Sequence, residues 1–358
     1  MTNKHHKIAT LFRAARKTLG GLLVLAIALS LGLVAIGCFV AQPLGGSNHP
    51  STEKVEAERL KNHVVMLSQT FLPRDWEHTA NLDKCADYIG AQFTSAGAAA
   101  VEFQPFEARG NQYRNVIGKF GVGKGDKVIV GAHYDACGPK PGADDNASGV
   151  AALMELASLL GRNPPNREIE LVAYVLEEPP FFRSPQMGSA IHAASIASER
   201  DKIAGMLVLE MVGFFSTEKN SQLWPTFTIN TIKNWSFQIS VAPLMRLCYP
   251  DRGDFITLVG DTDQGGWIRT IKQGMQGTTD LRVCSIRAPK LIPGIDWSDH
   301  LNYWNHGIKA LMVTDLAFCR NLAYHSMYDT ANRLDYVRMS KVVVGVFEAI
   351  RRAPQSNN

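Results

Sequence analysis

The chain has 358 residues, of which 46% are hydrophobic and 20% are charged, and its formal net charge is +4. This composition is ordinary for a globular protein and excludes a low-complexity chain, and the length allows one large domain or two modest ones. The first seventeen residues contain five Lys and Arg residues and no acid, so the remainder has a net charge of −1. That balance excludes a general electrostatic affinity for nucleic acid.

An uncharged and mostly apolar run, Leu19–Ala41, follows the basic N-terminus at residues 1–18. As a helix, its 23 residues would extend about 34 Å at about 1.5 Å each, which is enough to cross a bilayer. Because cations precede the run, we expect residues 19–41 to be a membrane anchor, with a cytoplasmic N-terminus and a body exported to the periplasmic or extracellular side. Two alternatives remain open: a cleaved signal peptide with secretion, and a lipoprotein cleaved before Cys38.

The body of the protein begins after a predicted linker at residues 42–55. Gln42–Ser51 is rich in Pro, Gly, Ser and Asn, which favour irregular structure. We expect a single catalytic domain over residues 56–353 and a short tail at 354–358. No internal repeat is visible.

The first predicted elements of the body are two helices and a hairpin. Apolar residues at helical spacing predict helices over Glu53–Gln69 and Asn81–Ala96. Val101–Phe106 and Tyr113–Phe120 predict two strands. Gly118–Lys124 matches the opening of a phosphate-binding loop, GxxxxGK, but no Ser or Thr and no helix follows, so we interpret it as a turn.

The stretch Val128–Gly149 carries a dense group of ionisable residues. A β-branched apolar run at its start predicts a buried strand that ends in His133 and Asp135. A Pro/Gly turn then separates this strand from Asp144 and Asp145, which stand at the start of a helix. In open α/β sheets, ligands bind outside the carboxyl ends of strands. These charges would be costly to bury without compensation, and a divalent metal is the simplest compensation.

Two further strands end in acidic residues. Glu168–Leu176 is followed by the pair Glu177-Glu178, and Gly205–Leu209 is followed by Glu210. A short helix is predicted between these strands over Gly188–Ala197, and strands that alternate with helices favour a mostly parallel sheet of the α/β class. Because parallel strands end at one edge of a sheet, we expect these groups to converge.

The remainder of the chain is less regular until its end. Phe214–Gln273 is expected to supply the walls and lid of the site, with a helical stretch within Ile229–Pro250 and a turn at Gly260–Gly266. The last predicted elements are a helix and strand unit (Asp299–His306 and Lys309–Thr314), a loop that carries Tyr324 and His325 (Asp315–His325), and a closing helix (Tyr336–Ile350).

Five cysteines follow the apolar run, and none belongs to a CxxC pair, which disfavours a cysteine-based zinc site. An exported body permits disulfides, and Cys248 with Cys284 is a candidate pair. The odd number leaves at least one free thiol, and we expect most of these residues to be small buried apolar groups.

The candidate metal ligands are two imidazoles and three carboxylates: His133, Asp145, Glu178, Glu210 and His325. Both kinds of group bind zinc, and such a set can hold two ions about 3.5–4 Å apart if one carboxylate bridges them. Glu177 is then free to move a proton from water to a leaving amine. Each residue alone has a simpler explanation, such as a structural histidine, a solvated glutamate pair or a helix cap. Their co-location on one sheet edge favours the metal site.

Six short motifs occur in the order found in a known family. They are GAHYD (131–135), GADDNASG (142–149), the Glu177-Glu178 pair, LEM (209–211), SDH (298–300) and YH (324–325). The chain resembles metallopeptidase family 28, the co-catalytic di-zinc exopeptidases that include bacterial leucyl aminopeptidases, over about residues 56–352. The resemblance implies a three-layer αβα fold, with helices on both faces of a mixed, mostly parallel and twisted sheet.

The resemblance also implies the ligand set of two zinc ions. His133 and Glu210 would bind one ion. Glu178 and His325 would bind the other. Asp145 would bridge the two ions. The expected activity is a zinc-dependent exopeptidase, most simply an aminopeptidase acting on peptide or protein N-termini.

The resemblance implies three further features. Glu177 would be the general base and then the general acid for a metal-activated water. Asp135 would orient His133. The bond Asp145-Asn146 would be the family's cis peptide, and Asp144 is expected to cap the following helix.

The chain departs from the family pattern at two positions, so its substrate class stays open. Many such aminopeptidases have Asp where Glu210 stands, and some have a carbonyl-polarising Tyr where Ile295 stands. Asp299 and His300 are expected either at the site or in structural roles. Four aromatic residues would line an apolar pocket or pack in the core: Phe181, Phe182, Phe255 and Trp304.

Two other functions remain alternatives. The sequence FFRSPQMGS (181–189) resembles a stretch of the glutaminyl cyclases, one-zinc acyltransferases of the same family. A non-catalytic, receptor-like domain is the third reading, which the complete ligand set disfavours. The sequence does not distinguish an aminopeptidase from a carboxypeptidase with certainty, and it leaves the oligomeric state open.

Overall fold

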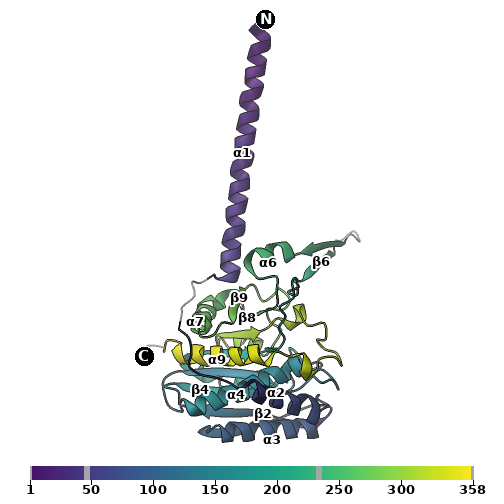
Figure 1. Cartoon of the computed structure of the whole chain (residues 1–358), viewed down its shortest axis with the longest axis vertical. Coiled ribbons are helices and arrows are strands. Elements are labelled where there is room, and N and C mark those ends of the chain that lie inside the picture. Colours follow the sequence, from purple (N-terminus) through teal and green to yellow (C-terminus); the bar gives the residue numbers. More distant parts are fainter. Residues whose placement is uncertain (1, 44–48, 231–235, 356–358) are drawn as a thin grey trace.

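A mixed sheet of eight strands forms the centre of the body (Figure 1). The computed structural model describes residues 2–43, 49–230 and 236–355. The strand order is β1-β2-β4-β3-β5-β10-β8-β9, and β4, β3, β5 and β10 are parallel neighbours. The strands are β1 (Ala100–Ala108), β2 (Asn111–Phe120), β3 (Lys127–His133), β4 (Glu168–Tyr174), β5 (Ile203–Leu209), β8 (Phe255–Gly260), β9 (Arg282–Arg287) and β10 (Ala310–Thr314).

The parallel strands are buried on both faces because nearly all of their residues are apolar. Along β3, Val128 and Val130 belong to one hydrophobic core, whereas Ile129 belongs to the core on the opposite face. This alternation is the two-residue period of a strand between two helical layers. The first layer contains α2 (Ala57–Val65), its continuation η1 (Met66–Thr70), α3 (Thr79–Ser95), α4 (Gly149–Arg162), α7 (Gly265–Met275) and α9 (Tyr336–Arg352); the second contains α5 (Gly188–Ser195) and α8 (His300–Trp304).

The predicted αβα arrangement is therefore confirmed, and the GxxxxGK segment is a turn, as expected. Gly121, Gly123 and Gly125 have positive φ angles of 61°, 76° and 58° between β2 and β3. Such angles favour glycine, which explains why three glycines stand there. No helix begins at this turn, so it lacks the geometry of a phosphate-binding loop.

The region Phe214–Gln273 differs from the prediction. It contributes β8 and α7 to the main sheet and its helical layer, rather than walls and lid alone. The helical stretch expected within Ile229–Pro250 is present as α6 (Ala242–Cys248). The hairpin of β6 (Thr226–Asn230) and β7 (Ser236–Ser240) before it was not predicted. Pairing with β10 decides the strand character of β8, and this partner lies more than fifty residues away in the chain.

The candidate disulfide between Cys248 and Cys284 is absent. All six cysteines are free. Cys248 lies on α6, with its sulfur near Gly37 of the N-terminal helix, whereas Cys284 lies on β9. The prediction was wrong because cysteine number and compartment permit a bridge without specifying the approach of the two side chains.

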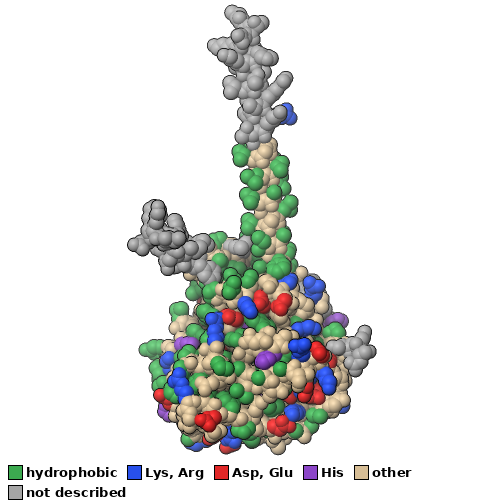
Figure 2. Space-filling view, turned by 180° about the vertical axis from the view of Figure 1, so that it is seen from behind, with side chains coloured by type: hydrophobic (Ala, Val, Ile, Leu, Met, Phe, Trp, Pro, Cys, Tyr) green, Lys and Arg blue, Asp and Glu red, His purple; other side chains and the backbone are tan. Residues whose placement is uncertain are grey.

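The N-terminal helix α1 (Thr2–Ala41) projects from the body (Figure 1). Its apolar part, Leu19–Ala41, is long enough to cross a membrane, and apolar side chains surround it (Figure 2). The C-terminal end of α1 is bound to the body. The buried Lys272 ammonium donates hydrogen bonds to the carbonyls of Ala41 and Gln42 at 3.0 and 2.9 Å. Helix-terminal carbonyls lack partners within the helix, so this cation completes the end of α1.

Candidate metal centre

The predicted ligands meet at the carboxyl edge of four adjacent parallel strands. His133 is the last residue of β3, Glu178 follows β4, and Glu210 follows β5 directly. His325 lies in the loop after β10. Asp145 lies in the segment η2 (Ala143–Ser148) between β3 and α4, at a point where the backbone is not helical. Parallel strands place all of these ends at one edge, which explains how residues almost 200 positions apart converge.

Asp145 stands between the two histidines. Its Oδ1 lies 3.4 Å from His133 Nε2, and its Oδ2 lies 3.0 Å from His325 Nε2. Glu210 Oε2 is 3.4 Å from His133 Nε2, and Glu178 Oε2 is 3.3 Å from His325 Nε2. The five side chains therefore form two groups that share one carboxylate.

The geometry of these groups fits metal ions. Tetrahedral ligands at about 2.0–2.2 Å from an ion lie about 3.4 Å from one another, close to the separations observed here. Both ring nitrogens of His133 are buried without a hydrogen-bond partner, and so is Oε1 of Glu178. Buried polar atoms normally have partners, so these atoms are suited to a ligand.

The carboxylates are crowded in a way that a cation would relieve. Burial raises the pKa of Glu178 to about 7, and the charge of Asp145 adds to the effect. Burial also raises the pKa of Glu177 and of Glu210, with neighbouring carboxylates contributing in both cases. A divalent ion would favour the charged forms of these groups.

Glu177 lies beside the two groups of ligands rather than within them. Its Oε2 is 3.8 Å from His133 Nε2, and its side chain lines the cleft above the site. The carboxylate of Asp135 accepts hydrogen bonds from the backbone N–H groups of Glu177 and Glu178 at 3.2 and 3.1 Å, and its Oδ1 lies 3.5 Å from His133 Nδ1. Asp135 therefore contacts both the histidine at the end of β3 and the acidic pair after β4.

The backbone around Asp145 is held by residues that the sequence motifs did not include. The carboxylate of Asp329 accepts the N–H groups of Asp144 and Asp145, each at 3.1 Å. The fully buried Arg74 donates to the carbonyls of Tyr134 and Gly142. No spacing pattern marks Arg74 or Asp329. The proximity of Asp329 to His325 in the chain was the only available signal.

The turn after β5 is also fixed by the segment that carries Asp145. Met211, directly after Glu210, has a left-handed φ of 51°, a conformation that costs about 1–2 kcal/mol for a residue other than glycine. Asn146 Oδ1 accepts the Met211 N–H at 3.0 Å, while its amide donates to the Leu209 carbonyl at 2.8 Å. The bond Asp145–Asn146 is cis, as the resemblance implied.

Three other predictions have mixed outcomes. The expected capping role of Asp144 was wrong, because its carboxylate accepts the Gly213 N–H at 3.1 Å. The side chain that accepts the first N–H of α4, that of Gly149, is Asn146, at 3.1 Å. Ser298 donates to Glu210 Oε2 at 2.6 Å and so orients a predicted ligand. His300 has a structural role, with Nε2 2.8 Å from the Ile295 carbonyl, while Asp299 is fully buried and its pKa is raised to about 7 by burial.

Cys137 is a neighbour of the site that sequence reasoning assigned to the core. Its sulfur and ligand atoms of Glu178 and His325 lie within 4.8 Å of one another. Lys140 Nζ donates to the same sulfur at 3.7 Å. Its position two residues after Asp135 was the available signal in the sequence.

A small cleft of about 80 Å³ lies over the carboxylates. Of the aromatic residues proposed for an apolar pocket, only Phe182 lines it. Phe181, Phe255 and Trp304 pack in the hydrophobic cores. The other large apolar walls are Met211, Trp297, Phe318 and Tyr324.

Comparisons with known proteins agree with this geometry. Residues 115–238 match the family described as "Peptidase family M28". The uncharacterized protein YfbL from Escherichia coli (strain K12) is 44% identical over 306 residues, which cover 83% of this chain and 88% of that protein. Aminopeptidase YwaD from Bacillus subtilis (strain 168) is 30% identical over 151 residues, covering 41% of this chain but 30% of that protein.

Solved structures show the same fold. The structure of BSAP, described as a zinc aminopeptidase from Bacillus subtilis, matches with a TM-score of 0.64. The match covers 84% of this chain and 96% of that chain at 15% sequence identity. At this identity the likeness concerns the αβα arrangement and the placement of its sheet edge, and it does not carry an activity across.

Proposed function

Because this chain belongs to peptidase family M28, we propose that it is a zinc-dependent exopeptidase, an aminopeptidase that removes residues from the N-termini of peptides. The observation that carries this proposal is the position of Asp145, whose two oxygens face the imidazoles of His133 and His325 at 3.4 and 3.0 Å. A bridging carboxylate between two histidines is the arrangement that a pair of ions requires.

The residues present would hold two ions. His133 and Glu210 would hold one, Glu178 and His325 the other, and Asp145 would bridge them. When bound, zinc lowers the pKa of water towards neutrality and polarises a carbonyl oxygen. Two ions would also compensate the four carboxylates that surround the cleft.

Glu177 is placed to transfer the proton. Its raised pKa, caused by burial and nearby acids, suits a group that accepts a proton from water and returns it to the leaving amine. Asp135 is a positioning residue in this mechanism, since it holds the backbone of Glu177 and approaches His133. The small volume of the cleft, about 80 Å³, fits an enzyme that acts on the end of a peptide chain.

The charge of the cleft favours an amino terminus over a carboxyl terminus. Among the described residues that line it, four are acidic and none is Lys or Arg. A carboxypeptidase needs a cation to pair with the terminal carboxylate of its substrate. A free α-amine, in contrast, is attracted to a carboxylate-rich site.

We also propose that α1 retains the enzyme on a membrane with the body exported. The basic residues before Leu19 favour this orientation. The contacts of Lys272 with Ala41 and Gln42 support attachment through the end of α1. Removal of a signal peptide by cleavage after Gln42 would take away the Ala41 and Gln42 carbonyls that accept from the buried Lys272 ammonium. A lipoprotein cleaved before Cys38 would keep both carbonyls.

The experiment that tests the activity is a panel of aminoacyl reporter substrates and Gln-initiated peptides, incubated with and without a chelator and analysed by mass. We expect release of single N-terminal residues that stops when the chelator is present and returns with zinc. Loss of ammonia from Gln-initiated peptides without residue release would instead identify a glutaminyl cyclase. No turnover of any substrate by zinc-loaded protein would overturn the enzymatic proposal.

A further inference from the structure

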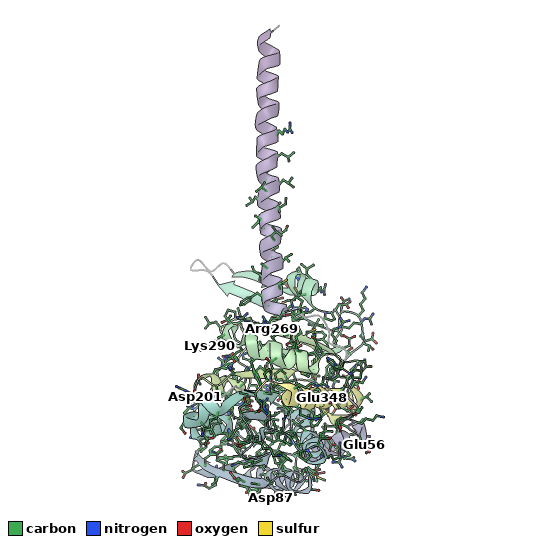
Figure 3. The ribbon with its side chains drawn as sticks, turned by 90° about the vertical axis from the view of Figure 1, so that its left-hand side faces the viewer. Glu56, Asp87, Asp201, Arg269, Lys290 and Glu348 are labelled. Atoms are coloured by element: carbon green, nitrogen blue, oxygen red, sulfur yellow. The ribbon has the colours of Figure 1, made fainter. Side chains whose placement is uncertain are left out.

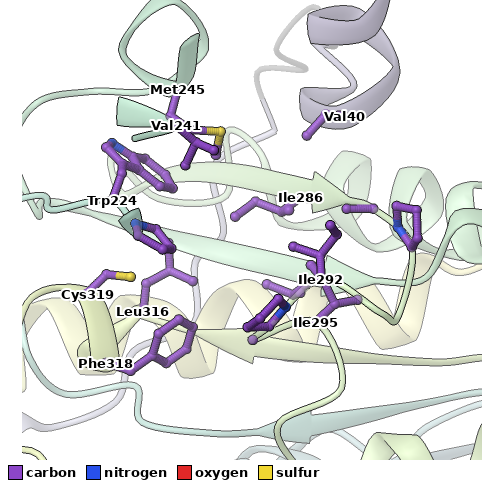
Figure 4. A pocket seen from close by; sticks show the side chains of 16 residues that line it. Val40, Trp224, Val241, Met245, Ile286, Ile292, Ile295, Leu316, Phe318 and Cys319 are labelled. Carbon is purple, nitrogen blue, oxygen red and sulfur yellow. The ribbon is translucent and has the colours of Figure 1, made fainter. Parts of the chain in front are cut away.

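An apolar cavity of about 330 Å³ lies at the foot of α1 (Figure 4). Its walls come from distant parts of the chain, and no charged side chain lines it. Val40 belongs to α1, Met245 to α6 and Ile286 to β9. Ile292 lies in a loop, and Phe318 lies in the short helix η5 (Ala317–Cys319). A volume of this size is typical of small ligand sites.

The cavity lies at the depth of a membrane surface if α1 crosses the bilayer. Val40 is the penultimate residue of the apolar span Leu19–Ala41. A Cβ atom at Gly37 would lie 3.0 Å from the sulfur of Cys248 in α6. Gly37 is four residues inside the span, or about 6 Å along the helix, so α6 lies beside its last turn. The span is about 34 Å long and the hydrocarbon core about 30 Å thick, which brings α6 to the boundary of the core.

Three exposed leucines lie next to the lining residues of this cavity along the chain. Leu247, two residues after the wall residue Met245, is 80% exposed. Leu291, directly before the wall residue Ile292, is 88% exposed. Leu223, next to the wall residue Trp224, is 49% exposed. Large apolar groups gathered at one surface mark a contact with a membrane or a partner.

Charged residues near the foot of α1 are suited to lipid headgroups. Arg269 and Lys290 are exposed there (Figure 3), and Arg246 is exposed on α6. Asp261 and Asp263 are the acidic residues of the neighbouring turn, and Asp261 is half-buried. These cations favour the phosphates of a bilayer surface, which attract nearby Lys and Arg side chains.

The cavity shares a wall with the metal centre. Phe318 lines both the cavity and the cleft over the carboxylates. Its ring packs edge-on against Trp297, with the centroids 5.6 Å apart. Whatever fills the cavity therefore contacts a side chain that also bounds the candidate substrate cleft.

We propose that this cavity binds one acyl chain of a bilayer lipid and thereby seats the α6 side of the body on the membrane. The occupant is a lipid because a membrane-spanning helix supplies part of the wall, and because the surrounding leucines and cations match the two layers of a bilayer surface. The proposal rests on retention of α1 and goes beyond the peptidase activity.

The test uses the full-length protein in vesicles of phosphatidylcholine and phosphatidylglycerol, with and without bromine on the acyl chains. Bromine quenches the fluorescence of indoles that it contacts. We expect Trp224→Phe to lose the larger part of the bromine-dependent quenching. Trp76→Phe is the control, since Trp76 does not line the cavity and packs against Phe181 instead, and it should retain the quenching.

A second pair of variants separates the cavity from the surface around it. Ala288 lines the cavity, so Ala288→Phe should fill it and lower the quenching of Trp224, whereas Ala288→Gly should not. Melting temperatures of both variants show whether each is folded. Unchanged quenching in folded Ala288→Phe would overturn the proposal.

Two further outcomes would also overturn it. Quenching that is the same in wild type and Trp224→Phe would show that lipid does not reach this wall. A raised KM for apolar reporter peptides in Ala288→Phe, with unchanged quenching, would identify the cavity as a substrate subsite. Quenching requires no turnover, so its result is independent of whether the peptidase assignment holds.

Discussion

The position of Asp145 depends on side chains that lie far from it in the sequence. Asp329 receives two N–H groups of the segment that carries Asp145, and Arg74 binds carbonyls of the preceding turn. Neither residue contacts the ligand atoms of the two histidines. Their effect is to present the Asp145 carboxylate between His133 and His325.

Substitution of Asp329 tests this positioning role. Asp329→Ala leaves two buried N–H groups without an acceptor, at about 1–3 kcal/mol each, so the free energy of unfolding should fall. Zinc affinity should fall about 10–100-fold, as is typical when a group that orients a ligand is removed. Calorimetric titration of zinc into metal-free protein checks the affinity. Asp329→Asn keeps one acceptor oxygen and should recover part of it, and a wild-type affinity in Asp329→Ala would contradict the role.

Glu177 carries the proton-transfer part of the proposal. Glu177→Gln removes the base but keeps the shape and leaves all five ligands in place, so zinc content should remain normal while kcat falls about 10²–10⁴-fold. Steady-state kinetics together with metal analysis checks this expectation. Glu107→Gln, at an exposed position of β1, is the matched control. Near-normal turnover by Glu177→Gln would remove Glu177 from the mechanism.

The elements on the second face of the sheet are joined by a buried polar network. Glu170 of β4 is 3.1 Å from His192 of α5, and His192 Nδ1 is 2.7 Å from the hydroxyl of Tyr303 in α8. Lys127 of β3 lies 3.3 Å from Glu170. The network links two strands and two helices, so it contributes to the docking of that layer.

This network predicts a dependence of stability on pH. Burial alone would raise the pKa of Glu170, but His192 and Lys127 outweigh it and lower the pKa from 4.5 to about 2. A pKa that is lower in the folded state stabilises the protein above the unfolded value of 4.5, and this contribution is lost as the pH falls through about 2. Glu170→Gln should therefore be less stable than wild type at pH 7, and the difference should shrink below pH 4.5 in urea unfolding. A difference that is constant with pH would contradict this account.

The packing of α7 on α9 provides a second test at the level of elements. A Cβ atom at Gly274 would lie 2.6 Å from the Cα atom of Ala349, whereas a Cβ at Gly266 meets nothing within 4 Å. Gly274→Ala should lower the free energy of unfolding by about 1–3 kcal/mol through overpacking. Gly266→Ala, in the same helix, should be neutral or stabilise by up to about 1 kcal/mol. Denaturant unfolding of both variants checks the contrast, and equal stabilities would contradict the close approach.

The whole molecule joins a candidate membrane helix to the body by direct contacts. Lys272 binds the last carbonyls of α1, Ser285 Oγ donates to the Ala41 carbonyl at 2.8 Å, and the Arg287 guanidinium lies 4.1 Å from the Phe39 ring centroid. These contacts fix the direction in which α1 leaves the body (Figure 1). The body would then have one preferred orientation on a membrane.

Removal of the Lys272 ammonium tests this attachment. Lys272→Met removes the donor to the Gln42 carbonyl and leaves the Ala41 carbonyl with Ser285 Oγ alone. The end of α1 should therefore detach more often, and limited proteolysis of membrane-bound protein should release the body faster. Lys84→Met, at an exposed position of α3 at the end of the body away from α1 (Figure 1), is the control and should be released at the wild-type rate. Turnover of short reporter peptides should be unchanged in both. Equal release rates for Lys272→Met and wild type would contradict the structural role of this cation.

Much of the centre of this protein follows from the sequence alone. The apolar runs of β3, β4, β5 and β10 predict a buried parallel sheet, because only strands covered on both faces lack a polar side. Parallel strands end at one edge, so the acids and imidazoles that follow them converge without knowledge of any contact. The order of the family motifs then assigns a role to each of these residues, which local pattern and composition cannot do.

Other features depend on contacts between distant residues, and the sequence does not display them. β8 is a strand because β10 pairs with it, Asp329 and Arg74 hold Asp145 through backbone groups, and the cavity at the foot of α1 has walls from six separate segments. None of these contacts produces a periodic pattern or a fixed spacing in the sequence, because each arises from the packing of helices and strands against one another. The chain therefore determines its strands and the chemistry at their ends, whereas the folded arrangement alone decides what holds that chemistry in place and what lies beside it.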